Sequence, residues 1–372
     1  MTRVVLTDFR NYARAELEAR PGPVVLTGPN GAGKTNVLEA ISYLSPGRGL
    51  RRARLGDVAR HGGAGGWAVA AGLAGTGDDD LRLGTGYAPD DAGNNGRRLV
   101  RINGEPAAGP AALAEWLRLV WLTPAMERLF AEGASGRRRF LDRLVLGFDA
   151  DHGRRAARYE RALRERARLL REGPADDAWL TALEARLAED GVALAAARLD
   201  VIARLRGALE AGVGPFPRAT LAVVGEVEGW LRDGPALEAE ARLRERLAAS
   251  RRQDGESGKT AVGPHRSDLA VRHVEKGLPA ALCSTGEQKA LLIAIVLADA
   301  RLQTAHAGSA PVLLLDEVTA HLDGARRAAL FEEILALGAQ AWLTGADRAP
   351  FGGLAGAAQF LAIDDGRIDP VE

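Results

Sequence analysis

The chain has 372 residues, of which 47% are hydrophobic, and its 49 basic and 49 acidic side chains give a formal net charge of zero. This length predicts at least two lobes, and the zero net charge excludes an overall basic field, so any nucleic-acid site must be a local patch. The only cysteine is Cys283, which excludes an intrachain disulfide. With no signal peptide and no apolar run of membrane-spanning length, we expect a cytoplasmic protein without a membrane partner.

The first third of the chain predicts short strands around one helix. Strand-like runs bounded by turn residues cover residues 4–6, 24–27, 67–73, 81–87 and 99–102. The predicted turns are Pro21-Gly22-Pro23, Asn94-Asn95-Gly96 and Asn103-Gly104. Apolar residues at helical spacing predict helices at 34–44 and 111–119, and we expect Trp116 and Trp121 to belong to the core.

The middle of the chain is predicted to be helical, because Ala, Leu, Arg and Glu dominate at helical spacing from about 137 to 211 and strand-like runs are absent there. Gly173-Pro174 predicts a break into at least two helices. The following segments read as a strand at 221–227, a helix at 237–250 and a polar link at 251–258.

The last third returns to alternating strands and helices. Strands are predicted at 269–274, 312–315 and 341–344, and helices at 289–304 and 324–337. The helix at 289–304 is apolar almost all round and should be buried. A hairpin turning at Asp365-Gly366 is predicted to end the chain. We therefore expect an α/β fold, a parallel core sheet with an antiparallel β subdomain, divided into 1–130, an inserted mainly helical lobe 131–250, and 251–372.

The stretch TGPNGAGKTN matches the phosphate-loop pattern G-x-x-x-x-G-K-[ST]. Its glycines let backbone N–H groups face phosphate oxygens, and the helix that follows adds its N-terminal dipole. Lys34 would reach the β- and γ-phosphates of ATP, and the Thr35 hydroxyl would bind Mg²⁺. A chance glycine-rich turn is the alternative, but the strand–loop–helix context argues against it. The predicted nucleotide-binding residues are Gly28, Pro29, Asn30, Gly31, Ala32, Gly33, Lys34, Thr35 and Asn36.

The stretch PVLLLDEVTAHLD is an apolar strand that ends in two acids, Asp316 and Glu317. Behind a phosphate loop, Asp316 is predicted to hold Mg²⁺ and Glu317 to orient the attacking water. Taken alone, the pair is equally compatible with an ordinary strand end carrying two solvated carboxylates.

Spacing indicates the class of ATPase, because most of the chain separates Lys34 from Asp316, and CSTGEQKALL lies just before the acidic strand. This arrangement resembles the ABC-type ATPase heads, whose signature turn is Ser-x-Gly-x-Gln. The resemblance implies that Ser284 and the Gly286 backbone contact the γ-phosphate of ATP held by Lys34 of a second subunit, so that ATP joins a homodimer. Lys34, Ser284 and Glu317 would then be the catalytic residues. AHLD resembles the dimer-facing loop of these heads and places Asp323 at the nucleotide.

Two departures from the ABC-type pattern imply slow hydrolysis. Thr344 stands where these heads often carry a switch histidine, and no glutamine precedes Gln253 to help bind Mg²⁺. We therefore expect a weak ATPase.

Within this class, five runs spread over the chain resemble the RecF family: DFRNY, GRGLRRARLGDVARHG, LTP, RRRFLD and GPHRSDL. The resemblance implies an ATP-dependent DNA-binding dimer acting on gapped duplex, single-strand/double-strand junction or single-stranded DNA. It also implies that DNA stimulates the weak ATPase activity, that the RecR and RecO proteins are partners and that the dimer helps to load recombinase.

The place where DNA would bind is left open by the sequence. One candidate is the loop with Arg48, Arg51, Arg52 and Arg54, for which a solvated loop is the alternative. The other is a stripe spaced for one helix face, at Arg154, Arg158, Arg161, Arg164, Arg168 and Arg171. Ion pairing along the helix is the commoner outcome for such a stripe.

Several smaller features and two other functions also remain open. His265 and Arg266 either brace the nucleotide site or form structural hydrogen bonds, and Cys283 is expected to be a packing residue. The chain is alternatively the ATPase subunit of a membrane transporter, although the long gap between motifs and GPHRSDL argue against this. A nucleotide-regulated scaffold that hardly hydrolyses ATP is the third possibility.

Overall fold

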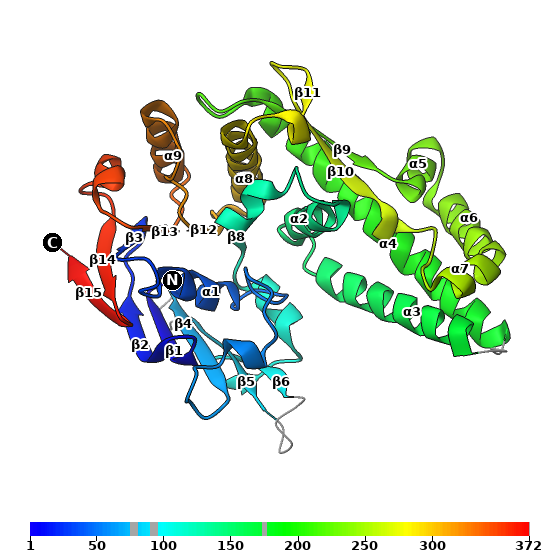
Figure 1. The fold of residues 1–372 in the computed structure, drawn as a ribbon, viewed down its shortest axis with the longest axis horizontal. Coiled ribbons are helices and arrows are strands. Elements are labelled where there is room, and N and C mark those ends of the chain that lie inside the picture. Colours follow the sequence, from blue (N-terminus) through cyan, green and yellow to red (C-terminus); the bar gives the residue numbers. More distant parts are fainter. Residues whose placement is uncertain (75–80, 90–95, 173–176, 372) are drawn as a thin grey trace. The chain divides into compact units, whose positions relative to one another are not determined.

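The computed structural model describes residues 1–74, 81–89, 96–172 and 177–371. The predicted turn residues Asn94 and Asn95 and the predicted break at Gly173-Pro174 lie outside these residues. Contacts divide the chain into two units (Figure 1). The first comprises Met1–Glu127, Gly212–Phe216 and Leu292–Glu372, and the second comprises Arg128–Ala211 and Pro217–Leu291.

The first unit contains a six-stranded sheet in the order β15-β14-β3-β13-β12-β8. All neighbouring strands are parallel except β15, which forms the predicted terminal hairpin with β14. The central strands are buried on both faces, which explains why their sequences are short continuous apolar runs. The strands are β3 (Val24–Thr27), β8 (Leu119–Leu122), β12 (Val312–Leu315), β13 (Ala341–Gly345), β14 (Gln359–Asp364) and β15 (Arg367–Val371).

The second sheet of this unit is antiparallel, in the order β2-β1-β4-β5-β6-β7, as predicted for the β subdomain. Its strands are β1 (Arg3–Phe9), β2 (Tyr12–Glu18), β4 (Trp67–Leu73), β5 (Leu81–Ala88), β6 (Arg97–Ile102) and β7 (Glu105–Pro106). The strands predicted at 4–6 and 24–27 are present as β1 and β3, which lie in different sheets, and β2 was not predicted. Asn103 and Gly104 have positive φ angles of 50° and 86° and form the predicted turn.

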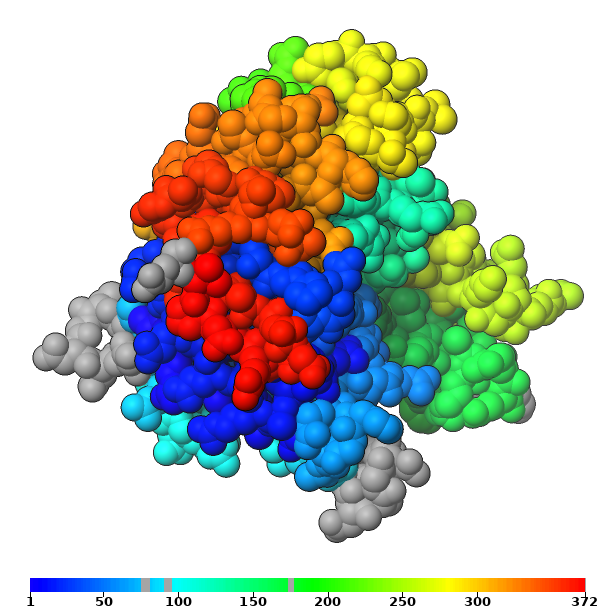
Figure 2. Space-filling model, turned by 60° about the vertical axis from the view of Figure 1, so that its left-hand side comes forward, coloured from blue at the N-terminus to red at the C-terminus, as the bar shows by residue number. Residues whose placement is uncertain are grey.

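The helices assigned to the first unit include α1 (Lys34–Ser42) and α9 (Gly324–Ala336), both close to their predicted bounds. The predicted helix at 111–119 was wrong, because a 3₁₀ helix at Pro110–Glu115 is followed by strand β8. Trp121 is buried as expected, but Trp116 is 47% exposed and is not a core residue. Figure 2 shows the C-terminal residues (red) beside N-terminal ones (blue), where Gln359 Nε2 donates to the Glu18 carbonyl at 2.8 Å.

Helix α8 (Thr285–Ala307) contains the residues predicted to form a buried helix and crosses the division between the two units. In the described part of the chain it is the one helix long and apolar enough to span a membrane. However, 67% of its most apolar window is buried inside the protein, as in the core helix of a globular unit.

The second unit is mainly helical, with a three-stranded antiparallel sheet in the order β11-β10-β9. Its helices are α2 (Ala134–Leu146), α3 (His152–Glu172), α4 (Asp177–Ala211), α5 (Glu226–Asp233), α6 (Ala236–Ala249) and α7 (Arg251–Ser257). Its strands are β9 (Ala219–Val224), β10 (Asp268–His273) and β11 (Leu278–Pro279).

One sequence prediction for this unit was wrong, because the polar link at 251–258 is helix α7, which turns Asp254 inward and ends at Gly258 in a left-handed conformation. The strand predicted at 221–227 is confirmed as β9, but it ends at Val224 and helix α5 begins at Glu226. Residues 251–291, which the sequence division grouped with the C-terminal part, group by contacts with the helical unit, since β10 pairs with β9.

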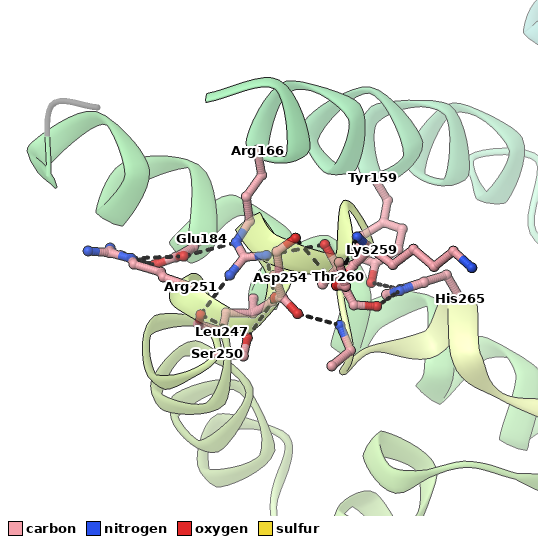
Figure 3. A network of polar contacts seen from close by, with 12 residues as sticks. Tyr159, Arg166, Glu184, Leu247, Ser250, Arg251, Asp254, Lys259, Thr260 and His265 are labelled. Carbon is pink, nitrogen blue, oxygen red and sulfur yellow. Dashed lines mark hydrogen bonds and ion pairs between the residues drawn. The ribbon is translucent and has the colours of Figure 1, made fainter. Parts of the chain in front are cut away.

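A buried ionic network joins the helices of this unit (Figure 3). Arg166 of α3 is fully buried and donates to Glu184 Oε1 of α4 at 2.9 Å and to Asp254 Oδ2 of α7 at 2.7 Å. It also donates to the Leu247 carbonyl at 2.7 Å. The two carboxylates are in turn bonded by Arg251 and Ser250, so the charges in this interior are paired.

We expect Arg166→Met to destabilise the protein by about 3–5 kcal/mol, because it leaves two buried carboxylates without their shared cation. Thermal or urea unfolding followed by circular dichroism measures the effect. Arg252→Met is the matched control, since Arg252 also lies in this unit but its side chain is 93% exposed. Equal stability of the two variants would contradict this assignment.

Candidate functional site

The phosphate-loop sequence forms the connection between β3 and α1, as predicted. Gly28, Gly31 and Gly33 have φ angles of 145°, 85° and 115°, a region that favours glycine. A Cβ atom on Gly28 would lie 2.0 Å from the Ile363 carbonyl oxygen, and one on Gly33 would lie 2.6 Å from Asn11 Nδ2. Two of these glycines are therefore required by the space around them as well as by their backbone angles.

Lys34, the first residue of α1, turns its side chain back over the loop. Its Nζ donates to the carbonyl oxygens of Gly28 at 2.6 Å and Pro29 at 2.8 Å. Burial lowers the pKa of Lys34, and the charges of Glu317 and Asp316 oppose that shift. The ammonium group is thus held inside the loop, where a phosphate group would be surrounded by backbone N–H groups.

The acidic strand meets the phosphate loop because β13 lies between β3 and β12, and the three strands are parallel. Their carboxyl ends therefore share one edge of the sheet. Thr35 Oγ1 donates to Asp316 Oδ1 at 2.9 Å, and Thr344 Oγ1 donates to the same oxygen at 2.7 Å. Asp316 is only 6% exposed. A buried carboxylate beside a hydroxyl is a donor set that fits Mg²⁺, which prefers oxygen ligands and also binds substrate phosphates.

Glu317 differs from its neighbour Asp316 in both exposure and backbone conformation. It is exposed and has a φ angle of 48°, a left-handed conformation uncommon for a residue other than glycine. Its N–H donates to Thr344 Oγ1 at 2.8 Å, so Thr344 fixes both acids at the end of β12. From the sequence, Thr344 was identified only as the replacement for a histidine, and its hydrogen bonds to Asp316 and Glu317 were not predicted.

The β1–β2 hairpin supports the phosphate loop through residues to which the sequence analysis assigned no role. Asn11 Nδ2 donates to the Ala32 carbonyl at 3.1 Å, and Tyr12 Oη donates to the Gly33 carbonyl at 3.1 Å. Asn36 Nδ2 donates to Asn11 Oδ1 at 2.8 Å. The signal was the alternation of YARAELE after Asn11, which predicts a strand and places Asn11 in a tight turn.

A second support lies under the first turns of α1. Glu39 is fully buried and accepts two hydrogen bonds from Arg10, at 2.8 and 2.7 Å, and one from Arg51 at 2.7 Å. Arg51 also donates to Asn36 Oδ1 at 2.6 Å. Of the four loop arginines considered for DNA, Arg51 is thus committed to holding the nucleotide helix.

The signature turn belongs to the second unit and forms the start of α8. The Ser284 N–H donates to Glu287 Oε2 at 3.0 Å and the Glu287 N–H to Ser284 Oγ at 3.4 Å, which is a capping box. Hydrogen bonding to Lys276 is the main cause that lowers the pKa of Glu287 to about 2. Gln288 is buried and donates to the Cys283 carbonyl at 2.9 Å. The glutamate and the glutamine of this motif therefore have structural partners within the unit.

The serine and the glycine of the turn face outward. Ser284 is exposed, and a Cβ atom on Gly286 would meet no atom within 4 Å. Packing within the chain does not require glycine at this helical position, where glycine costs about 1 kcal/mol relative to alanine. Close approach of another molecule is a physical reason for its presence.

The remaining predicted residues have local partners. Asp323 caps α9 by accepting a hydrogen bond from the Arg326 N–H at 2.8 Å. His265 bonds Tyr159 Oη at 2.8 Å and the Thr260 carbonyl at 3.0 Å, both in the second unit, which supports the structural alternative for this residue. Cys283 is buried, as expected for a packing residue.

The arginine stripe lies on the exposed face of α3, but most of its charge is paired. Arg154, Arg164 and Arg168 form ion pairs with acids on or next to the same helix. Arg158 pairs with Asp190 of α4, which is buried. The alternative considered from the sequence, a solvated face with ion pairs along the helix, therefore accounts for this stripe. Replacing Arg158 with an acid would leave the buried Asp190 carboxylate without its cation.

Fold and site together define a class. Residues 1–347 match the model of the family described as RecF/RecN/SMC N terminal domain. The fold is that of ABC-type ATPase heads, and a solved SMC head bound to the C-winged helix domain of ScpA has a TM-score of 0.54 at 16% identity, covering 100% of this chain and 97% of that one.

Within that class, the similarity to one family extends over the whole chain. The DNA replication and repair protein RecF of Mesorhizobium japonicum is 52% identical, covering 100% of this chain and 98% of the relative. RecF of Brucella suis biovar 1 is 50% identical over 98% of this chain and 95% of its own length. The chain belongs to the RecF family. A solved structure of the recombination mediator protein RecF-ATPrS has the same fold, with a TM-score of 0.86 at 23% identity, covering 100% of this chain and 98% of that one.

Proposed function

We propose that the chain is an ATP-dependent DNA-binding protein of recombinational repair and replication. It binds gapped or junction DNA as a dimer that ATP holds together, hydrolyses ATP slowly, and acts in the cytoplasm with RecR and RecO to help load recombinase. Family membership supports the role in DNA replication and repair and disfavours the transporter alternative. The observation that carries the nucleotide chemistry is the meeting of Thr35, Asp316 and Thr344 beside Lys34.

The residues present fit ATP and Mg²⁺. Backbone N–H groups of the loop and Lys34 would bind the phosphates, and Thr35 with Asp316 would hold Mg²⁺, which neutralises charge that develops on the transferred group. Glu317, which is exposed beside the metal residues, would accept a hydrogen bond from the attacking water and orient it. Thr344 holds that carboxylate's backbone but offers no cation toward the γ-phosphate, which supports slow turnover.

The dimer follows from the outward-facing signature turn. Ser284 and Gly286 are accessible, and hydrogen bonds of the Glu287 and Gln288 side chains to the backbone stabilise the start of helix α8. A twofold axis would set Ser284 of each chain against the nucleotide bound by Lys34 of the other, giving two equivalent composite sites. Asp323, exposed at the start of α9, belongs to the same proposed interface.

Glu317→Gln is expected to keep ATP affinity and to lower the hydrolysis rate by about 10²-fold or more, because the water loses its orienting carboxylate. Phosphate release under single-turnover conditions measures the rate. The control is Glu332→Gln, an exposed glutamate of α9 in the same unit. Hydrolysis by Glu317→Gln at the rate of the unaltered protein would remove Glu317 from the mechanism. No hydrolysis by the unaltered protein would favour the scaffold alternative.

The DNA-binding proposal is tested by fluorescence anisotropy of a labelled gapped duplex with ATP, with ADP and without nucleotide. ATP is expected to strengthen binding, since two copies of each basic surface act together in the dimer. Equal affinity for DNA under the three conditions would contradict DNA binding by an ATP-dependent dimer.

A further inference from the structure

A basic pocket lies on the first unit, and its lining includes none of the residues assigned to the nucleotide. It has a volume of about 400 Å³, within the range of small-ligand sites. Three arginines line it, Arg48, Arg54 and Arg98, and Leu55, Tyr87 and Pro110 supply apolar wall. Its lining contains no acidic side chain among the residues that the structure describes.

Arg98 lines the pocket, and the hydrogen bonds that it forms within the described chain go to neutral oxygen atoms. It donates to Thr85 Oγ1 at 2.9 Å, to the Ser45 carbonyl at 3.0 Å and to the carbonyls of Tyr43 and Gly47, and its guanidinium lies 5.4 Å from the Tyr43 ring centroid. Burial lowers the pKa of Arg98 to about 10. The group therefore stays charged at neutral pH, and in the described chain no carboxylate forms an ion pair with it.

The loop after α1 presents the second arginine in a defined conformation. Gly47 and Gly49, on either side of Arg48, have φ angles of 97° and 64°. A Cβ atom on Gly49 would lie 2.9 Å from both Ser42 Oγ and the Tyr43 ring, so the loop packs closely on α1. Arg98 holds the loop from the other side through its carbonyls. Arg48 is exposed, and so is Arg54 farther along the same segment.

We propose that this pocket binds a phosphate group of the nucleic-acid backbone. Three arginines that line one pocket, with no carboxylate partner among the described residues, attract an anion, and guanidinium groups bind phosphate oxygens in a fork-like geometry. The apolar wall of Leu55, Tyr87 and Pro110 suits the sugar attached to a backbone phosphate. Contacts of this kind position nucleic acid without reading its sequence. The assignment rests on the proposed DNA-binding function and gives that function a location.

Such a contact would be linked to the nucleotide site through one short segment. Arg51 lies between Arg48 and Arg54 in the chain, and it bonds Asn36 and Glu39 on the helix that follows the phosphate loop. A phosphate that orders this segment would therefore stabilise the first turns of α1.

The test is DNA binding by the double variant Arg48→Ala/Arg54→Ala with ATP, measured by anisotropy over a series of salt concentrations. Both arginines are exposed, so the fold should persist, and unchanged ATP affinity checks this. We expect affinity to fall by roughly tenfold or more and the slope of log K against log salt to decrease by about one to two, since each lost phosphate contact removes about 0.7–0.9. Arg14→Ala is the control, an arginine of the same unit whose side chain is 74% exposed.

The outcomes separate this inference from the function on which it rests. If the unaltered protein fails to bind gapped DNA with ATP, the proposed function is wrong. If the unaltered protein binds and the double variant binds with the same affinity and salt slope, the pocket is not a backbone site. Calorimetric titration with inorganic phosphate forms a second arm. Phosphate binding that the double variant loses while its DNA binding stays intact would assign the pocket to free phosphate and overturn the backbone assignment.

Discussion

Lys34→Ala is expected to abolish stable ATP binding. The Lys34 ammonium group is buried within the loop and bonded to the carbonyls of Gly28 and Pro29, so a phosphate in the loop would meet it with little screening by water. Removing one partner of a buried, hydrogen-bonded charge pair costs about 2–5 kcal/mol, which corresponds to roughly 30-fold to several thousand-fold in Kd.

Calorimetry or a fluorescent ATP analogue measures this loss directly. Lys259→Ala is the matched control, because Lys259 is exposed and lies in the other unit. The DNA affinity of Lys34→Ala in the presence of ATP should match that of the unaltered protein without nucleotide. ATP binding by Lys34→Ala at the affinity of the unaltered protein would show that the nucleotide binds elsewhere.

Ser284→Arg is expected to bind ATP and to remain monomeric. Ser284 is exposed, so the larger side chain fits the isolated chain, but in the proposed dimer it would occupy the space of the partner's γ-phosphate. Multi-angle light scattering in the presence of ATP measures the dimer population, and a nucleotide-binding assay confirms that Lys34 still functions.

Ser284 also caps α8, so the loss of the cap must be separated from the added bulk. Ser284→Ala removes the cap, at a cost of about 0.5–2 kcal/mol, without adding volume. We expect Ser284→Ala to retain ATP-dependent dimerisation, at least in part, whereas Ser284→Arg loses it. A Ser284→Arg protein that dimerises as the unaltered protein does would exclude the composite site.

The phosphate loop and the acidic strand could be predicted because the residues that define each of them are consecutive in the sequence. Glycines required by positive φ angles, a lysine, a threonine and an apolar strand ending in Asp316 each carry a local signal. Their meeting at one sheet edge follows from the rule for parallel strands. The outward-facing Ser284 also agrees with its predicted place in an interface, although its role there remains a prediction.

Other features depend on contacts between distant parts of the chain and had weak local signals. Strand β8 is a four-residue apolar run that can be read equally well as the end of a helix, and only its pairing with β12 decides. Helix α7 has no apolar face in its sequence, because the side chain that it turns inward is Asp254, which accepts a hydrogen bond from the buried Arg166. The supporting residues Asn11 and Glu39 have partners far along the chain, and such partners are not visible in one sequence.

The number and spacing of arginines in the sequence did not predict which of them are available to bind DNA. The α3 stripe has the spacing of a binding face, yet its residues are largely paired, and one of them neutralises a buried acid on α4. Arg98, in contrast, had no predicted role, but it is a partly buried cation in a pocket whose described lining has no acidic side chain. The difference lies in which carboxylates each guanidinium meets, and this depends on tertiary structure.

The rate of ATP hydrolysis with and without gapped duplex DNA, at constant salt, tests most directly whether the protein is a DNA-dependent ATPase. We expect a slow basal rate that rises when gapped DNA is added, because DNA held by both subunits favours the dimer in which hydrolysis takes place. We also expect Lys34→Ala and Ser284→Arg to show no rise. A rate that is the same with and without DNA, in a protein shown to bind ATP, would contradict the assignment as a DNA-dependent ATPase.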